Sequence, residues 1–127
     1  MSSQPRAVAA LLVTLMLVTA CSEPEACTLV FAFGIEVEVR DASTDELIAG
    51  RVHGVITDGA FEDSLRVAGG DPAAATTLVG AGERAGIYAV HLEGVGYQPW
   101  DTTNVEVTRD ACHVHPVTFT ARLEPAP

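Results

Sequence analysis

The residues of this chain that could take part in chemistry are its three cysteines and four histidines. The run Cys112-His113-Val114-His115 is the densest group, and on a strand its two imidazoles share one face. Thiolates and imidazoles bind zinc and copper, so the candidate metal ligands are His53, His91, His113 and His115. Because only Asp110 adds a carboxylate close to this run, we favour the interpretation that all four histidines are solvent-facing strand residues. We therefore predict no metal and no cofactor.

The first twenty residues have the three parts of a secretory signal. Arg6 supplies a positive start, residues 7–20 are uncharged and mostly aliphatic, and small residues lead into Cys21. This run is shorter than the roughly 20 residues needed to span the hydrocarbon core of a bilayer. We therefore predict a signal peptide over residues 1–20.

The end of this segment, Val18-Thr19-Ala20-Cys21, resembles the lipobox of bacterial lipoproteins, with Val18 where leucine is commonest. The resemblance implies that Cys21 carries diacylglycerol and palmitate-like acyl chains and becomes the new N-terminus, with residues 21–26 as a short tether. Ser22 in place of aspartate implies the outer membrane in cells with two membranes. An ordinary signal peptide beside a chance cysteine is the alternative.

Once Cys21 is assigned to lipid, Cys27 and Cys112 form an even pair in an exported chain. An even pair in an oxidising compartment predicts one disulfide, and a thiol metal site is the rival interpretation. Closing a loop of this length stabilises a fold by roughly 4–5 kcal/mol in the chain-entropy model.

Charge excludes several classes of function. The chain has 17 acidic residues against 7 arginines and no lysine, a formal net charge of −10. Removing residues 1–20 takes away one arginine and no acid, which leaves 107 residues with a charge of −11. Lysine Schiff-base chemistry, a P-loop lysine and a basic nucleic-acid surface are therefore excluded.

Alternating apolar and polar residues predict strands that position these groups. Residues 31–40 form the clearest run, with Glu36 and Glu38 facing water. Cys27 shares the parity of the apolar residues, so we expect it to point inward. We interpret the two acids as a solvated sheet edge that discourages pairing with another chain.

Further strands are expected along the rest of the chain. Asp58-Gly59 lies between two β runs and predicts a hairpin with a type I′ turn. In the last strand, residues 112–123, the parity of the apolar residues changes at Pro116, which predicts a β-bulge. The total is about seven strands without helical periodicity, which predicts an antiparallel β-sandwich, transthyretin-like or Ig-like, over residues 27–124.

Several strand and turn patterns occur in a particular order: Val37-Glu38-Val39-Arg40-Asp41, Leu47-Ile48-Ala49-Gly50, Gly86-Ile87-Tyr88-Ala89-Val90, Gly96-Tyr97-Gln98-Pro99-Trp100 and Val107-Thr108-Arg109-Asp110-Ala111-Cys112-His113-Val114. This order resembles the carboxypeptidase regulatory-like domain, a seven-stranded transthyretin-like sandwich of bacterial envelope proteins. The resemblance implies a non-catalytic accessory or adhesion module. It assigns no functional residues, because the matching positions are turns and core.

The sequence also suggests roles for Tyr88, Gly96 and Trp100. Tyr88 is expected in the core or as a hydroxyl-to-backbone latch, and Gly96 at a positive φ. Trp100 is a candidate platform for sugar rings, although a lone tryptophan more often covers a core. The loop from Asp41 to Asp45 begins like a calcium loop, but Glu46 stands where an EF-hand needs glycine.

We therefore expect a non-catalytic lipoprotein of the cell envelope, anchored through Cys21 and facing an oxidising space. It would serve as a structural or protein-interaction module, with an envelope protein or glycan as its partner. The alternative is a module that binds carbohydrate or a transition metal through Trp100 or the histidines.

Overall fold

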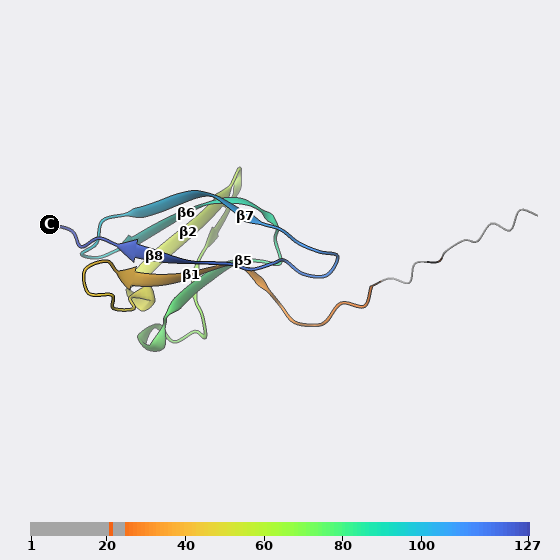
Figure 1. Cartoon of the computed structure of the whole chain (residues 1–127), viewed down its shortest axis with the longest axis horizontal. Coiled ribbons are helices and arrows are strands. Elements are labelled where there is room, and N and C mark those ends of the chain that lie inside the picture. Colours follow the sequence, from red (N-terminus) through yellow and green to blue (C-terminus); the bar gives the residue numbers. More distant parts are fainter. Residues whose placement is uncertain (1–20, 22–24) are drawn as a thin grey trace, which may run out of the picture.

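The computed structural model describes Cys21 and residues 25–127, so the predicted signal peptide and Ser22 lie outside the described residues. Eight strands form two sheets that pack face to face (Figure 1). The strands are β1 (Phe33–Asp41), β2 (Val52–Asp58), β3 (Phe61–Ser64), β4 (Arg66–Val67), β5 (Thr77–Gly82), β6 (Gly86–Gly94), β7 (Trp100–Val107) and β8 (Val117–Leu123). Two short 3₁₀ helices, η1 (Ala49–Arg51) and η2 (Pro72–Ala74), complete the elements. The predicted all-β sandwich is confirmed.

One sheet has the strand order β4-β5-β1-β8, and β1 lies near its middle. The apolar residues of the alternation in β1, Ile35, Val37 and Val39, are fully buried. Glu36 and Glu38 lie half-buried on the other face of this central strand, so their interpretation as a sheet edge is wrong. Alternation reports which face a residue is on, but it carries no information about which strands are neighbours.

The pairing of β1 with β8 is parallel, whereas β1 pairs antiparallel with β5. The expectation of a wholly antiparallel sandwich is therefore wrong for this one pair. The second sheet, in the order β3-β2-β6-β7, is antiparallel throughout.

The predicted hairpin joins β2 to β3, with Asp58 paired to Phe61. Its central turn residues are thus Gly59 and Ala60, one position later than expected. Gly59 has a φ of 58°, whereas neither Asp58 nor Ala60 has a positive φ. A positive φ at the first central position only is the pattern of a type II′ turn, so the predicted type I′ turn is wrong.

The chain switches sheets at Leu65, which divides one predicted run into β3 and β4. β3 pairs with β2, and β4 pairs with β5 in the other sheet. Leu65 is buried, and a Cβ at Gly54 or at Gly80 would lie 2.7 or 2.6 Å from its Cδ atoms. The two glycines, one in each sheet, therefore leave the space that this leucine fills.

The last predicted strand also differs from the observed one. Arg109 and Val114 form an isolated bridge, which makes residues 109–114 a small loop, and β8 begins only at Val117. The change of parity at Pro116 marks the end of this loop, so the predicted β-bulge is wrong. The parity of β8 itself is as expected, with Ala121 and Leu123 fully buried.

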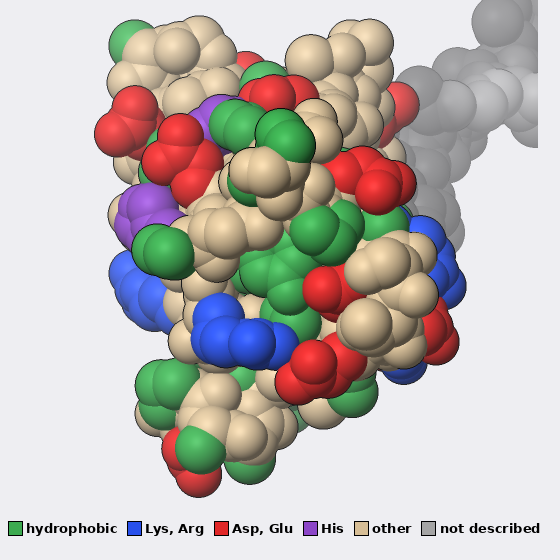
Figure 2. All heavy atoms as spheres, turned by 90° about the vertical axis from the view of Figure 1, so that its left-hand side faces the viewer, with side chains coloured by type: hydrophobic (Ala, Val, Ile, Leu, Met, Phe, Trp, Pro, Cys, Tyr) green, Lys and Arg blue, Asp and Glu red, His purple; other side chains and the backbone are tan. Residues whose placement is uncertain are grey.

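The two ends of the sandwich differ. Residues 25–32 leave at one end, and the C-terminus lies at the other (Figure 1). We call the second end, which includes residues 94–99 and 124–127, the far end; Tyr97 bridges to Pro125 there. Figure 2 faces it and shows apolar side chains near its middle with acidic and arginine side chains around them. Gly96 in this region has a φ of 85°, as predicted.

Tyr88 is fully buried, and its hydroxyl donates to the backbone oxygen of Arg84 at 2.9 Å. The same hydroxyl accepts from Nη1 of Arg84, whose guanidinium also contacts Asp58 and lies 3.9 Å from the centre of the Phe61 ring. The predicted core position and backbone latch are both confirmed.

Replacing Tyr88 with phenylalanine should lower the free energy of unfolding by about 1 kcal/mol, because the ring stays buried while the hydroxyl's hydrogen bonds are lost. Urea denaturation measures this change. Ile87→Ala, at an exposed neighbouring position, is the control and should change stability by less than about 0.5 kcal/mol. Equal stability of Tyr88→Phe and the wild type would contradict the latch.

Candidate functional site

Cys27 and Cys112 form a disulfide, with their Cα atoms 5.1 Å apart, which confirms the predicted pairing. Cys27 is nevertheless exposed and precedes β1 by six residues, so the expectation that it points inward is wrong. The apolar parity of β1 does not extend back to it, because the strand begins only at Phe33. We call the end of the sandwich that carries this bond the disulfide end.

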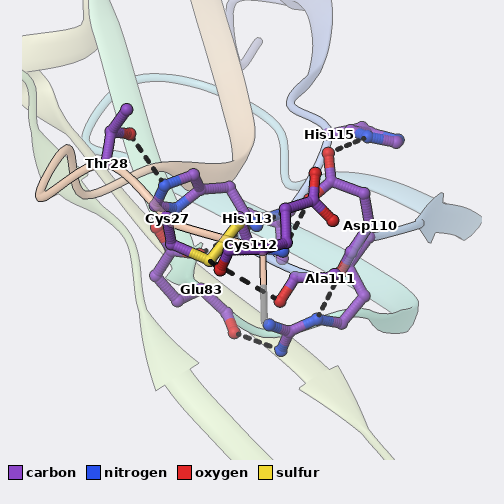
Figure 3. Close-up of a disulfide and its surroundings, with 11 residues drawn as sticks. Cys27, Thr28, Glu83, Asp110, Ala111, Cys112, His113 and His115 are labelled. Carbon is purple, nitrogen blue, oxygen red and sulfur yellow. Dashed lines mark hydrogen bonds and ion pairs between the residues drawn. A yellow bond between two sulfur atoms is a disulfide. The ribbon is translucent and has the colours of Figure 1, made fainter. Parts of the chain in front are cut away.

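Glu83 joins three segments at the disulfide end (Figure 3). Its Oε1 accepts the backbone N–H of Ala32 at 2.7 Å and lies 2.8 Å from Nδ1 of His113. Its Oε2 accepts the backbone N–H of Val114, and Nε2 of His113 is 3.0 Å from Oγ1 of Thr28. The hydrogen bond from Ala32 and then that with His113 lower the pKa of Glu83. Sequence reasoning missed this residue, since none of its partners is near it in the chain.

Asp110 shapes the loop that holds Cys112. Its Oδ1 accepts the backbone N–H groups of Cys112 and His113 at 2.7 and 2.9 Å, and its Oδ2 is 3.1 Å from Nε2 of His115. The backbone hydrogen bonds are the largest cause that lowers the pKa of Asp110 to about 2. His113 and His115 thus contact different carboxylates rather than a shared centre.

The other two histidines lie on neighbouring strands of the second sheet. Nδ1 of His91 is 2.6 Å from Oδ1 of Asp101, and Nε2 is 3.0 Å from Oε1 of Glu93. His53, on β2, is exposed and pairs in register with Glu93. The hydrogen bond with Asp101, followed by that with Glu93, raises the pKa of His91.

The sheet therefore brings His53 and His91 to adjacent strands, while His113 and His115 belong to the disulfide end. Within the residues that the structure describes, no group of three or more histidine, cysteine, aspartate or glutamate side chains is arranged to hold a metal ion. The hydrogen bonds of the His91, His113 and His115 side chains are with carboxylates and hydroxyls of the fold itself.

The loop whose sequence begins like a calcium site starts at Asp41. Asp41 is buried, and both oxygens of its carboxylate accept hydrogen bonds from the protein. Oδ1 accepts the backbone N–H groups of Ser43 and Thr44 and the hydroxyl of Ser43, and Oδ2 accepts the hydroxyl of Tyr97 at 2.8 Å. These bonds, that from the Ser43 hydroxyl first, hold the pKa of Asp41 well below its usual range. The contact with Tyr97 spans 56 positions in sequence and was not expected.

Trp100 is half-buried and stacks on Phe119, with ring centroids 6.1 Å apart and an interplanar angle of 20°. Trp100 begins β7 and Phe119 lies in β8, so the pair connects the edges of the two sheets. This contact supports the role of covering the core over that of a sugar platform.

A hollow of about 440 Å³ lies at the far end. Its lining includes Arg51, His53, Glu93, Tyr97 and the fully exposed Val95. It combines an apolar wall with charges of both signs, which suits a polar ligand or a protein surface.

Cys21 is exposed and lies outside the disulfide. Within the described part of the chain, no helix is long and apolar enough to cross a membrane. No family model matches the chain, and no curated protein matches it.

Loss of the disulfide should lower the free energy of unfolding by about 4–5 kcal/mol in the chain-entropy model, because the bond closes a sequence separation of 85. Urea denaturation of Cys27→Ala/Cys112→Ala against the oxidised wild type measures this loss. Reduced wild-type protein should match the double variant. An unchanged midpoint and slope would contradict a stabilising bond.

The raised pKa of His91 makes stability depend on pH. Below pH 6.5, the pKa of His91 in the unfolded chain, the stabilisation from protonated His91 is fully present. This stabilisation is lost as the pH rises through the higher pKa of His91 in the folded protein. Asp101→Asn should move the pKa of His91 back toward 6.5, as followed by NMR titration of the imidazole. Asp110→Asn, which contacts His115 instead, is the control and should leave His91 unchanged. A His91 pKa that Asp101→Asn leaves in place would exclude this pairing in solution.

Proposed function

We propose that this protein is a non-catalytic lipoprotein of the bacterial cell envelope whose β-sandwich serves as a structural or protein-interaction module. The observation that carries the proposal is the disulfide between Cys27 and Cys112, which fastens the chain to the domain six residues after Cys21. Disulfides persist in oxidising spaces outside the cytoplasm, which is where a lipobox directs a protein. Lipid on Cys21 would thus hold the disulfide end of the domain near the membrane.

The sandwich supports the resemblance to carboxypeptidase regulatory-like domains. Such a domain is expected to have two packed sheets of short strands, and this chain has two sheets of four. The resemblance implies an accessory or adhesion role, and this role is the one that we propose.

The engagement of the acidic side chains supports a role without catalysis. Asp41, Glu83 and Asp110 each accept backbone N–H groups, and their pKa values are lowered. A general acid or base needs a pKa near the working pH, whereas these carboxylates stay ionised and hold loops in place.

The far end supports a binding role directed away from the membrane. Its hollow, with Val95 and Tyr97 beside Arg51 and Glu93, offers apolar and charged groups to an envelope protein. The alternative function, binding of carbohydrate or a transition metal, would use the same hollow through His53. Calorimetric titration with zinc, copper and a set of glycans distinguishes the two, since heat on any of them favours the alternative.

Cys21→Ala should abolish incorporation of a labelled lipid precursor and move the protein from the membrane fraction to the soluble fraction, because two or three acyl chains provide the anchoring energy. Labelling in a bacterial host with fractionation measures both effects. Cys27→Ala/Cys112→Ala is the matched control and should keep its label. Absence of lipid on the wild-type protein would overturn the anchor.

A further inference from the structure

An exposed apolar run follows the disulfide-bonded Cys27 almost directly. Leu29 is fully exposed, and Val30 and Phe31 are 68% and 61% exposed. Three consecutive large apolar residues in water are costly, and such patches mark sites of interaction with proteins or membranes. This run is therefore a candidate binding surface.

The run is held on the body of the domain at both ends. Cys27 is bonded to Cys112 on one side, and the backbone N–H of Ala32 donates to Glu83 on the other. The Phe31 ring packs edge-on against Phe33 and covers Gly82, where a Cβ would lie 2.3 Å from the ring. A partner that binds this run would therefore orient the whole sandwich.

Arg109 and the apolar run line one hollow of about 360 Å³ at the disulfide end. Every other arginine in residues 25–127 has a carboxylate oxygen within 4.0 Å. The exposed guanidinium of Arg109 donates instead to the backbone oxygens of Asp110 and Glu83, with no carboxylate of the described residues within that distance. The positive charge of Arg109 thus lies next to the apolar run in a chain that is acidic as a whole.

We propose that residues 29–31 and Arg109, together the membrane patch, bind the interface of a phospholipid bilayer. The apolar side chains would enter the boundary between headgroups and acyl chains, and the guanidinium would contact lipid phosphate. The inference rests on the proposed function in one respect, that Cys21 holds the chain at a membrane.

Distance and charge favour a bilayer as the partner. Leu29 follows Cys21 by eight residues, so an extended tether keeps it within about 26–29 Å of the lipid. The net charge of −11 after signal removal opposes binding to anionic lipids. A zwitterionic bilayer has phosphate groups but no net charge. Arg109 can contact such a phosphate while the three apolar residues contact the acyl chains.

Tryptophan fluorescence tests the proposal on the lipidated full-length product in vesicles of phosphatidylcholine. Leu29→Trp and Val95→Trp, both made in a Trp100→Phe background, report on two fully exposed positions at opposite ends of the sandwich. We expect a blue shift for Trp at position 29 and quenching by lipids brominated about 5–10 Å into the bilayer. We expect neither effect at position 95. Arg109→Gln should reduce the quenching at position 29.

Equal quenching at both positions would overturn the proposal. Quenching at neither position would also overturn it and would point to a protein as the partner of the run. Quenching at position 29 that Arg109→Gln leaves unchanged would remove the arginine from the patch. Mass analysis of Cys21 tests the anchor separately. If no lipid is found, the chain is coupled through its Cys21 thiol to maleimide lipid in the same vesicles, so a failed anchor and a failed patch give different results.

Discussion

Burial of the inner face of β1 is the constraint on which the rest of the sandwich depends. Ile35, Val37 and Val39 are fully buried, and β1 is hydrogen-bonded on both sides, to β5 and β8. The second sheet must cover this face, and it does so with Tyr88, Val90 and Leu92 of β6, which are also buried. The connections between strands lie mainly at the two ends, with the contacts of Glu83 and Asp110 at one end and the hollow beside Tyr97 at the other.

An acidic chain without lysine holds those connections with carboxylates. Asp41 fixes the loop after β1, and Asp110 fixes the loop before β8. Glu83, in the turn between β5 and β6, holds the segment before β1 and the loop before β8 through the N–H groups of Ala32 and Val114. Each carboxylate accepts backbone N–H groups that a loop would otherwise leave to water. These three carboxylates therefore have a structural role.

The two ends then have different properties. The disulfide end combines the attachment of the N-terminal segment with exposed apolar side chains and Arg109. The far end combines a hollow with charges of both signs and the C-terminus. A domain held at a membrane by its disulfide end would present the far end to the surrounding space, so attachment and binding would not compete for one surface.

Local patterns in the sequence determined which residues face the core, because alternation along a strand depends only on neighbours. They also indicated the hairpin after β2 and the buried Tyr88, whereas the pairing of Cys27 with Cys112 followed from the number of cysteines. The switch of sheets at Leu65, the parallel pairing of β1 with β8 and the exposure of Cys27 were decided only by the tertiary structure. So were the contacts of Glu83 with His113, of Asp41 with Tyr97 and of Trp100 with Phe119. Each of these three contacts joins residues that are not neighbours in the chain, and their proximity follows from how the two sheets pack.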